Sequence, residues 1–106
     1  TAAAFDERIS RLKPQPGQVA VSGNLLRILQ GSVIVTSHPD DGKVQDPYSL
    51  RCIPQVHGAC RQTLRHAEEV LNIELNSVTD NPLVFADTGD VVSGGNFHGE
   101  ALALCM

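Results

Sequence analysis

One long amphipathic segment constrains the fold of this 106-residue chain more than any other feature. Apolar residues recur along it every three or four positions, the spacing that places side chains on one face of an α-helix. They are Ile53, Val56, Cys60, Leu64, Ala67, Leu71, Leu75 and Val78. The pattern predicts one helix over 54–76, roughly 35 Å long at a rise of about 1.5 Å per residue. Pro54 suits its first turn, where a missing N–H removes no hydrogen bond.

The apolar face of such a helix must pack against other helices, and the rest of the chain supplies too few of them. Residues 2–13 and 18–30 repeat apolar residues at helical spacing, and a Pro-Gln-Pro-Gly break separates them. Gly31 is expected to end the second helix. Two short helices cannot cover a stripe of roughly 35 Å. The pattern therefore favours a larger helical bundle or an oligomer.

The other segments are expected to be shorter. β-branched residues at 33–36 predict an extended stretch within a loop over 32–47. Two β-rich runs flank an Asp-Thr-Gly-Asp turn and predict a small β-hairpin near 83–93. A last helix is expected over 97–106, with Asn96 as its N-cap. The predicted fold class is mainly α, a single internal fragment of a long-helix bundle with one hairpin.

Composition argues against several classes of function. Twelve acidic and eight basic residues give a net charge of −4, and the basic residues do not cluster. We therefore expect no nucleic-acid partner and no membrane-surface partner. No apolar stretch is long enough to span a bilayer, so the cytoplasm is the expected location. The chain has no initiator Met and ends in an apolar run, so we expect an internal piece of a longer protein.

The cysteines and histidines do not form a predicted metal site. His57 and Cys60 share a helix face, but no other pair of ligands has the spacing of a zinc site. Cys52 and Cys60 are separated by roughly 12 Å of helix, which is too far for a disulfide. Reduced and buried thiols are therefore expected.

The densest group of polar side chains lies at the entrance of the long helix. It comprises Gln45, Asp46, Tyr48, Arg51 and Gln55. Tyr48 and Arg51 are three positions apart, so on a helical turn they would face the same way. A guanidinium beside a phenol suits a substrate carboxylate, because Arg donates two parallel N–H bonds. The alternative, which the spacing alone favours, is that both residues cap the helix and bind loop carbonyls.

A second candidate is the glycine-rich turn over 94–99, Gly-Gly-Asn-Phe-His-Gly. A turn that opens a helix can bring backbone N–H groups to an anion. It lacks the spacing of the known phosphate-binding patterns. The alternative, favoured by pattern alone, is a tight turn that needs positive φ.

Three runs in register resemble the aromatic amino acid ammonia-lyase family. They are VQDPYSLRCIPQVHGA at 44–59, ELNSVTDNPL at 74–83 and SGGNFHGE at 93–100, joined by the turn RLKPQPGQ at 11–18. The likeness covers nearly the whole chain. Pro47, Ser49 and His98 resemble the histidine ammonia-lyase branch more than the phenylalanine branch.

The resemblance implies non-oxidative elimination of ammonia from L-histidine to give urocanate, a step of histidine catabolism. It implies an all-helical homotetramer with composite active sites. It also implies a 4-methylidene-imidazol-5-one (MIO) electrophile, formed autocatalytically from Ala-Ser-Gly, and no metal. The 106 residues contain no Ala-Ser-Gly, so the fragment alone is expected to be inactive.

The resemblance also implies roles for four residues. Arg51 matches an arginine that holds the substrate carboxylate. Tyr48 matches an essential catalytic tyrosine, and Gln45 a catalytic glutamine that hydrogen-bonds near the electrophile. Phe97 matches a phenylalanine that shields the electrophile. Two alternatives stay open: a tyrosine or phenylalanine ammonia-lyase or aminomutase, and a helical assembly module without chemistry.

Overall fold

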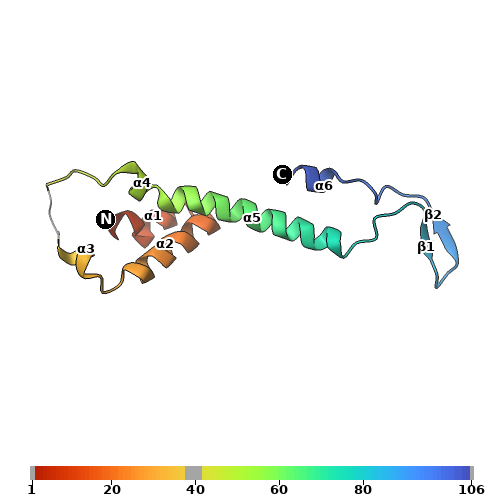
Figure 1. Ribbon diagram of the computed structural model, residues 1–106, viewed down its shortest axis with the longest axis horizontal. Coiled ribbons are helices and arrows are strands. Elements are labelled where there is room, and N and C mark those ends of the chain that lie inside the picture. The colour runs from red at the N-terminus through yellow and green to blue at the C-terminus, as the bar shows by residue number, and fades with distance from the viewer. Residues whose placement is uncertain (1, 38–41, 106) are drawn as a thin grey trace. The chain divides into compact units, whose positions relative to one another are not determined.

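A computed structural model describes residues 2–37 and 42–105 of the chain. Its elements are, in order, η1 (Ala2–Phe5), α1 (Glu7–Leu12), α2 (Pro16–Leu29), α3 (Val33–Ser37), α4 (Tyr48–Arg51), α5 (Ile53–Leu75), β1 (Leu83–Phe85), β2 (Asp90–Val92) and α6 (Glu100–Ala103) (Figure 1). The predicted fold class, mainly α with one small hairpin, is confirmed. The chain divides into two compact units, Thr1–Gln62 and Thr63–Met106, and α5 crosses the boundary between them.

The helix predicted over 54–76 is α5, shifted by one residue at each end. Pro54 lies in its first turn and is less than 2% exposed. The short helix α4 precedes it, and the backbone hydrogen bonds continue across the junction. The Cys52 N–H donates to the Tyr48 carbonyl, and the Val56 N–H donates to the Cys52 carbonyl, both at 3.0 Å. The two helices therefore follow one almost continuous helical path.

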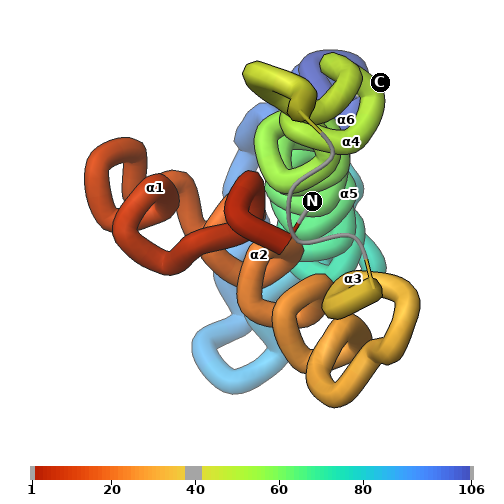
Figure 2. Tube along the Cα trace, turned by 90° about the vertical axis from the view of Figure 1, so that its left-hand side faces the viewer, coloured from red at the N-terminus to blue at the C-terminus, as the bar shows by residue number. Residues whose placement is uncertain are grey.

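In the first unit, α2 meets α5 through two buried glycines. A Cβ on Gly17 would lie 2.0 Å from the Gly58 carbonyl oxygen, which is much closer than any real side chain allows. Two hydrogen bonds fasten the contact: the Gly17 N–H donates to Gln62 Oε1 at 3.1 Å, and Gln62 Nε2 donates to Gln15 Oε1 at 3.2 Å. Figures 1 and 2 both show α2 alongside the N-terminal part of α5.

The helix predicted over 2–13 is wrong as a single element, because it divides at Asp6 into η1 and α1. The Asp6 side chain caps α1 by accepting the Arg8 N–H at 2.8 Å. Phe5, just before the cap, is 2% exposed, and its carbonyl accepts the Ser22 hydroxyl of α2 at 2.7 Å. The break turns the chain so that Phe5 packs against α2 while Asp6 caps the next helix.

The second helix, predicted over 18–30, begins two residues earlier at Pro16, since proline fits the first helical position. The prediction that Gly31 ends it is supported, because Gly31 has a φ of +72°.

The extended stretch predicted at 33–36 is wrong, because Val33–Ser37 forms the helix α3. Local hydroxyl groups support this helix: Ser32 Oγ accepts the Val35 N–H at 3.4 Å, and Thr36 Oγ1 donates to the Val33 carbonyl at 3.0 Å. Such local bonds outweigh a weak β-propensity. The loop predicted over 32–47 therefore begins later, and its residues 38–41 lie outside the described part of the chain.

In the second unit, the predicted hairpin is confirmed. β1 pairs antiparallel with β2, with Leu83 opposite Val92 and Phe85 opposite Asp90. The turn between them contains Gly89 at a φ of +77°, and the Gly89 N–H donates to the Phe85 carbonyl at 2.8 Å. This positive φ explains the glycine at that position.

The last predicted helix, 97–106, is wrong in extent. α6 spans only Glu100–Ala103 in the described chain, and its N-cap is Gly99 rather than Asn96. The Asn96 side chain is engaged elsewhere, because its Nδ2 donates to the Val78 carbonyl at 3.3 Å. Met106 lies outside the described residues.

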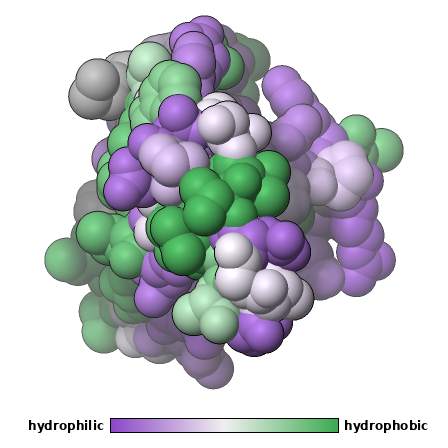
Figure 3. Space-filling model, turned by 90° about the vertical axis from the view of Figure 1, so that its right-hand side faces the viewer, coloured by the Kyte–Doolittle hydropathy of each residue, from purple (hydrophilic) through white to green (hydrophobic). Residues whose placement is uncertain are grey.

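Much apolar surface is exposed in this chain. On the second half of α5, Leu64 is 71% exposed and Leu75 is 80% exposed. On the hairpin, Val84 is 70% exposed. Figure 3 views the hairpin end and shows apolar side chains gathered near the middle of that face. Among the described helices, none has the length and apolar character needed to cross a membrane.

Candidate functional site

Tyr48 and Arg51 are the first and last residues of α4. The turn is held by the Arg51 N–H and the Leu50 N–H, which both donate to the Pro47 carbonyl at 3.0 Å. Tyr48 is 68% exposed, whereas Arg51 is half-buried. A separation of three residues on a helical turn allows both side chains to face one way. That they jointly bind a substrate stays a prediction.

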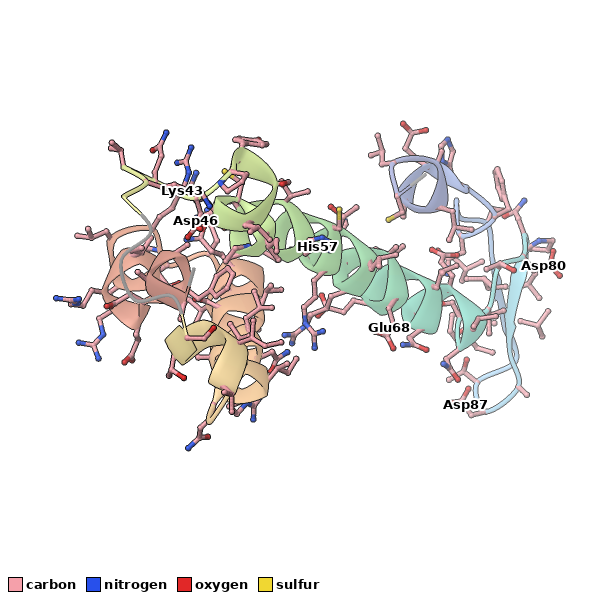
Figure 4. The ribbon with its side chains drawn as sticks, turned by 60° about the vertical axis from the view of Figure 1, so that its left-hand side comes forward. Lys43, Asp46, His57, Glu68, Asp80 and Asp87 are labelled. Atoms are coloured by element: carbon pink, nitrogen blue, oxygen red, sulfur yellow. The ribbon has the colours of Figure 1, made fainter. Side chains whose placement is uncertain are left out.

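A loop carbonyl positions the Arg51 side chain. Arg51 Nε donates to the carbonyl oxygen of Asp46 at 2.7 Å. This bond agrees with the alternative that the arginine binds a loop carbonyl, and it does not conflict with a binding role. A guanidinium has five N–H donors, and the four on Nη1 and Nη2 take no part in this bond. Figure 4 shows Asp46 close to Lys43 on the segment that leads into α4.

Two glutamines flank α4. Gln45 is exposed on the segment before α4, three residues from Tyr48. Gln55 is half-buried in the first turn of α5, and its Oε1 is buried without a hydrogen-bond partner among the described residues. Together with Tyr48 and Arg51, these side chains make a group of uncharged and cationic donors around one short helix.

The glycine-rich turn over 94–99 is anchored to the segment that follows α5. The Asn81 side chain accepts the Gly94 N–H at 2.9 Å, and Asn96 Nδ2 bonds the Val78 carbonyl. The positive-φ glycines of the described chain are Gly31, Gly42 and Gly89, so the prediction of a positive-φ turn at 94–99 is wrong. The anion-binding alternative is weakened, because Asn81 already occupies one backbone N–H of this turn. Phe97 is 62% exposed on the anchored turn.

An open cavity of about 310 Å³ lies beside this turn. It is lined by Glu74, Ser77, Val78, Thr79, Gly95, Asn96 and His98. His98 Nδ1 accepts the Glu100 N–H at 3.2 Å, which places the proton of a neutral ring on Nε2. The cavity is therefore polar and rich in hydrogen-bonding groups.

Neither the cysteines nor the acidic residues of the described ranges form a metal centre, since no group of three or more His, Cys, Asp or Glu could hold an ion there. Cys52, Cys60 and Cys105 are free thiols. The prediction that they are buried is wrong, because Cys60 is exposed and the other two are half-buried. Their burial was predicted from the general tendency of free cysteines to be buried.

A family model described as "Aromatic amino acid lyase" matches residues 1–106. The chain belongs to the aromatic amino acid lyase family. The predicted resemblance is thereby confirmed. The match covers both candidate regions, the one around α4 and the one over 94–99.

Several curated proteins of this family are similar to the chain over most of the chain's length. A histidine ammonia-lyase of Paracidovorax citrulli is 59% identical over 99 residues, which is 93% of this chain and 19% of the relative. A histidine ammonia-lyase of Aromatoleum aromaticum is 60% identical over the same shares of the two chains. The chain thus spans about a fifth of the length of these relatives.

Two solved structures share the fold of this lyase chain. Phenylalanine aminomutase of Pantoea agglomerans is 30% identical with a TM-score of 0.81, over 99% of this chain and 24% of that one. Ergothionase of Treponema denticola, solved with desmethyl-ergothioneine sulfonic acid, is 26% identical with a TM-score of 0.83, over 96% of this chain and 20% of that one. The fold is therefore that of longer lyase and aminomutase chains.

The structure assigns the predicted residues of this lyase chain to separate units. Gln45, Tyr48 and Arg51 belong to the first unit, and Phe97 belongs to the second. Sequence reasoning missed Asn81, whose side chain anchors the turn that carries Phe97. The available signal was the Thr-Asp-Asn-Pro run within the 74–83 motif, for which no anchoring role was predicted.

Proposed function

We propose that the protein containing this chain eliminates ammonia from L-histidine to give urocanate. The observation that carries the proposal is the 59% identity to a histidine ammonia-lyase over 93% of this chain. The aligned stretch is long enough to include α4 and most of the remaining chain. Identity to the solved aminomutase is lower, at 30%. This difference favours the histidine branch over the phenylalanine and tyrosine branches.

Arg51 would bind the substrate carboxylate in this reaction. Its Nε is occupied by the Asp46 carbonyl, so the Nη1–Nη2 edge is the part that can donate two parallel bonds. A carboxylate held in this way fixes the α-carbon and brings the β-carbon to a defined position. Tyr48, three residues away and exposed, would lie beside the bound amino acid. Gln45 would contribute an uncharged amide that can donate a hydrogen bond near the electrophile.

The proposed electrophile is the MIO group, which would form from an Ala-Ser-Gly outside these 106 residues. When present, it supplies an electron-deficient centre that makes the substrate amine a better leaving group. The side chains of this chain fit such a neutral heterocycle. Phe97 exposes 62% of its surface on an anchored turn and would exclude water and stray nucleophiles with its aromatic face. Tyr48 and Gln45 would donate hydrogen bonds to oxygen without adding charge.

We further propose that the whole protein is a cytoplasmic homotetramer. The apolar stripe of α5 supports the assembly, because side chains such as Leu64, which is 71% exposed, need cover that these residues do not provide. The family resemblance also implies active sites composed of several subunits.

Turnover of L-histidine by the full-length protein tests the function. Urocanate absorbs in the ultraviolet, so its appearance is followed directly, with L-phenylalanine and L-tyrosine as parallel substrates. Turnover of L-histidine alone is the expected outcome. Turnover or isomerisation of an aromatic substrate instead would move the protein to the aminomutase or phenylalanine branch, which the fold shared with the Pantoea agglomerans enzyme also permits.

The assembly-module alternative is tested by the parent sequence. A parent without Ala-Ser-Gly, and without turnover of the three amino acids, would indicate a lyase fold kept for assembly alone. A variant of the full-length protein with the serine of that tripeptide replaced by alanine is the matched control, and it is expected to be inactive and folded.

A further inference from the structure

Gln55 carries a buried carbonyl oxygen without a partner among the described residues. Buried acceptors in folded proteins are almost always paired, because an unpaired one loses its hydrogen bonds to water without replacement. The side chain belongs to the first turn of α5, next to the fully buried Pro54. A donor is therefore expected from a group near the junction of α4 and α5.

Arg51 is the nearest cationic donor along this helical path. The hydrogen bonds from Cys52 to Tyr48 and from Val56 to Cys52, both 3.0 Å, carry the helix across the junction. Residues four apart on such a path share a face, and helical side chains lean towards the N-terminus. The amide of Gln55 therefore leans over the turn that carries Arg51.

The guanidinium has enough donors for both neighbours and a ligand. One N–H is given to the Asp46 carbonyl at 2.7 Å. Of the remaining four, two on the Nη1–Nη2 edge can bind a carboxylate, and two are left over. A neutral carbonyl acceptor suits one of these, because it orients the guanidinium without neutralising its charge.

We propose that Gln55 is a positioning residue for Arg51. With substrate bound, Gln55 Oε1 accepts one Nη–H, and together with the Asp46 carbonyl it holds the guanidinium plane towards the carboxylate. This inference rests on the proposed function in one respect: the substrate must carry an α-carboxylate, which L-histidine, L-phenylalanine and L-tyrosine share.

Gln55→Met in the full-length protein tests the inference, because methionine keeps the length of the side chain and removes the acceptor. KM for L-histidine is expected to rise about tenfold with kcat nearly unchanged, since the loss lies in carboxylate binding. Two inhibitors separate positioning from general disruption. Imidazole propionate, which carries a carboxylate, should bind about tenfold more weakly, and histamine, which has none, should bind as before.

Gln30→Met is the matched control, because Gln30 is exposed at the end of α2 and caps that helix through its backbone N–H. It should leave both inhibitor constants unchanged. An unchanged KM in Gln55→Met, or equal weakening of both inhibitors, overturns the inference. If Gln55→Met does not fold, Gln55→Glu replaces it: a carboxylate beside Arg51 should weaken imidazole propionate and spare histamine.

Failure of the proposed function is recognised separately. A wild-type protein that turns over none of the three amino acids refutes that function. In that case, calorimetry of inhibitor binding still tests whether Gln55 positions Arg51. Equal affinity of wild type and Gln55→Met for imidazole propionate overturns this positioning role.

Discussion

Gly17 and Gly58 bring α2 and α5 into backbone contact, with no room for a side chain between the two helices. A Cβ on Gly58 would lie 2.5 Å from the backbone nitrogen of Gln18, and one on Gly17 would lie 2.0 Å from the Gly58 carbonyl oxygen. Gly58 lies seven residues beyond Arg51 along almost the same helical path. The glycine contact therefore helps to place the α4 turn that carries Tyr48 and Arg51.

Gly58→Ala should destabilise the full-length protein by about 1–3 kcal/mol, the usual cost of overpacking a close contact. The added methyl group would meet backbone atoms, which cannot rotate away. Chemical unfolding of the variant measures the change. Gly23→Ala is the matched control within α2, because its Cβ would meet nothing within 4 Å. It should stabilise the helix by about 0.5–1 kcal/mol, and equal behaviour of the two variants would contradict the tight crossing.

Arg51→Ala should lower kcat/KM of the full-length enzyme by about 100-fold, chiefly through KM, because two charge-assisted bonds to the carboxylate are lost. Steady-state kinetics with L-histidine measures this. Arg51→Lys should recover only part of the loss, since an ammonium cannot donate the same parallel pair. Arg65→Ala serves as a control, because Arg65 bonds Glu69 at 3.0 Å in an exposed pair. Unaltered kinetics of Arg51→Ala would remove its carboxylate role.

The stability of the first unit should depend on acid through Asp6. Hydrogen bonds from Arg8 lower the pKa of Asp6 from 3.8 to about 2. Because the folded value is the lower one, the stabilising contribution is complete above pH 3.8 and is lost as the pH falls towards 2. Asp6→Asn keeps a capping oxygen and removes the charge. The unfolding midpoints of wild type and variant should converge as the pH falls over this range. Midpoints that stay the same distance apart at every pH would show that the Asp6 charge does not stabilise the fold.

The 106-residue chain alone should self-associate, because the stripe on α5 exposes 71% of Leu64 and 48% of Leu71. Sedimentation over a range of concentrations measures the association. Leu64→Glu should shift the chain towards monomer by placing a charge on the stripe. His66→Glu adds the same side chain two residues away, where a helix does not face the same side, and should leave association unchanged. A folded monomer at all concentrations would contradict this prediction.

The elements differ in how well local sequence predicted them. The helix α5 was predicted to within one residue at each end, because seven of the eight periodic apolar positions lie within it. The segment Val33–Ser37 was predicted wrongly, because five residues carry too little periodic signal to outweigh β-branched propensity. The last helix was predicted too long, since the Asn96 side chain bonds the Val78 carbonyl, eighteen residues away in sequence, instead of capping.

The mainly helical fold, the hairpin turn at Gly89 and the family could all be predicted from the amino-acid sequence, because periodicity, turn chemistry and motifs are local properties of the chain. Three features became visible only after folding: Gly17 meets Gly58, the Asp46 carbonyl holds Arg51, and Gln55 Oε1 is buried without a partner among the described residues. These depend on which backbone atoms approach one another after folding. A glycine or a glutamine carries no local signal that distinguishes a packed contact from an exposed turn.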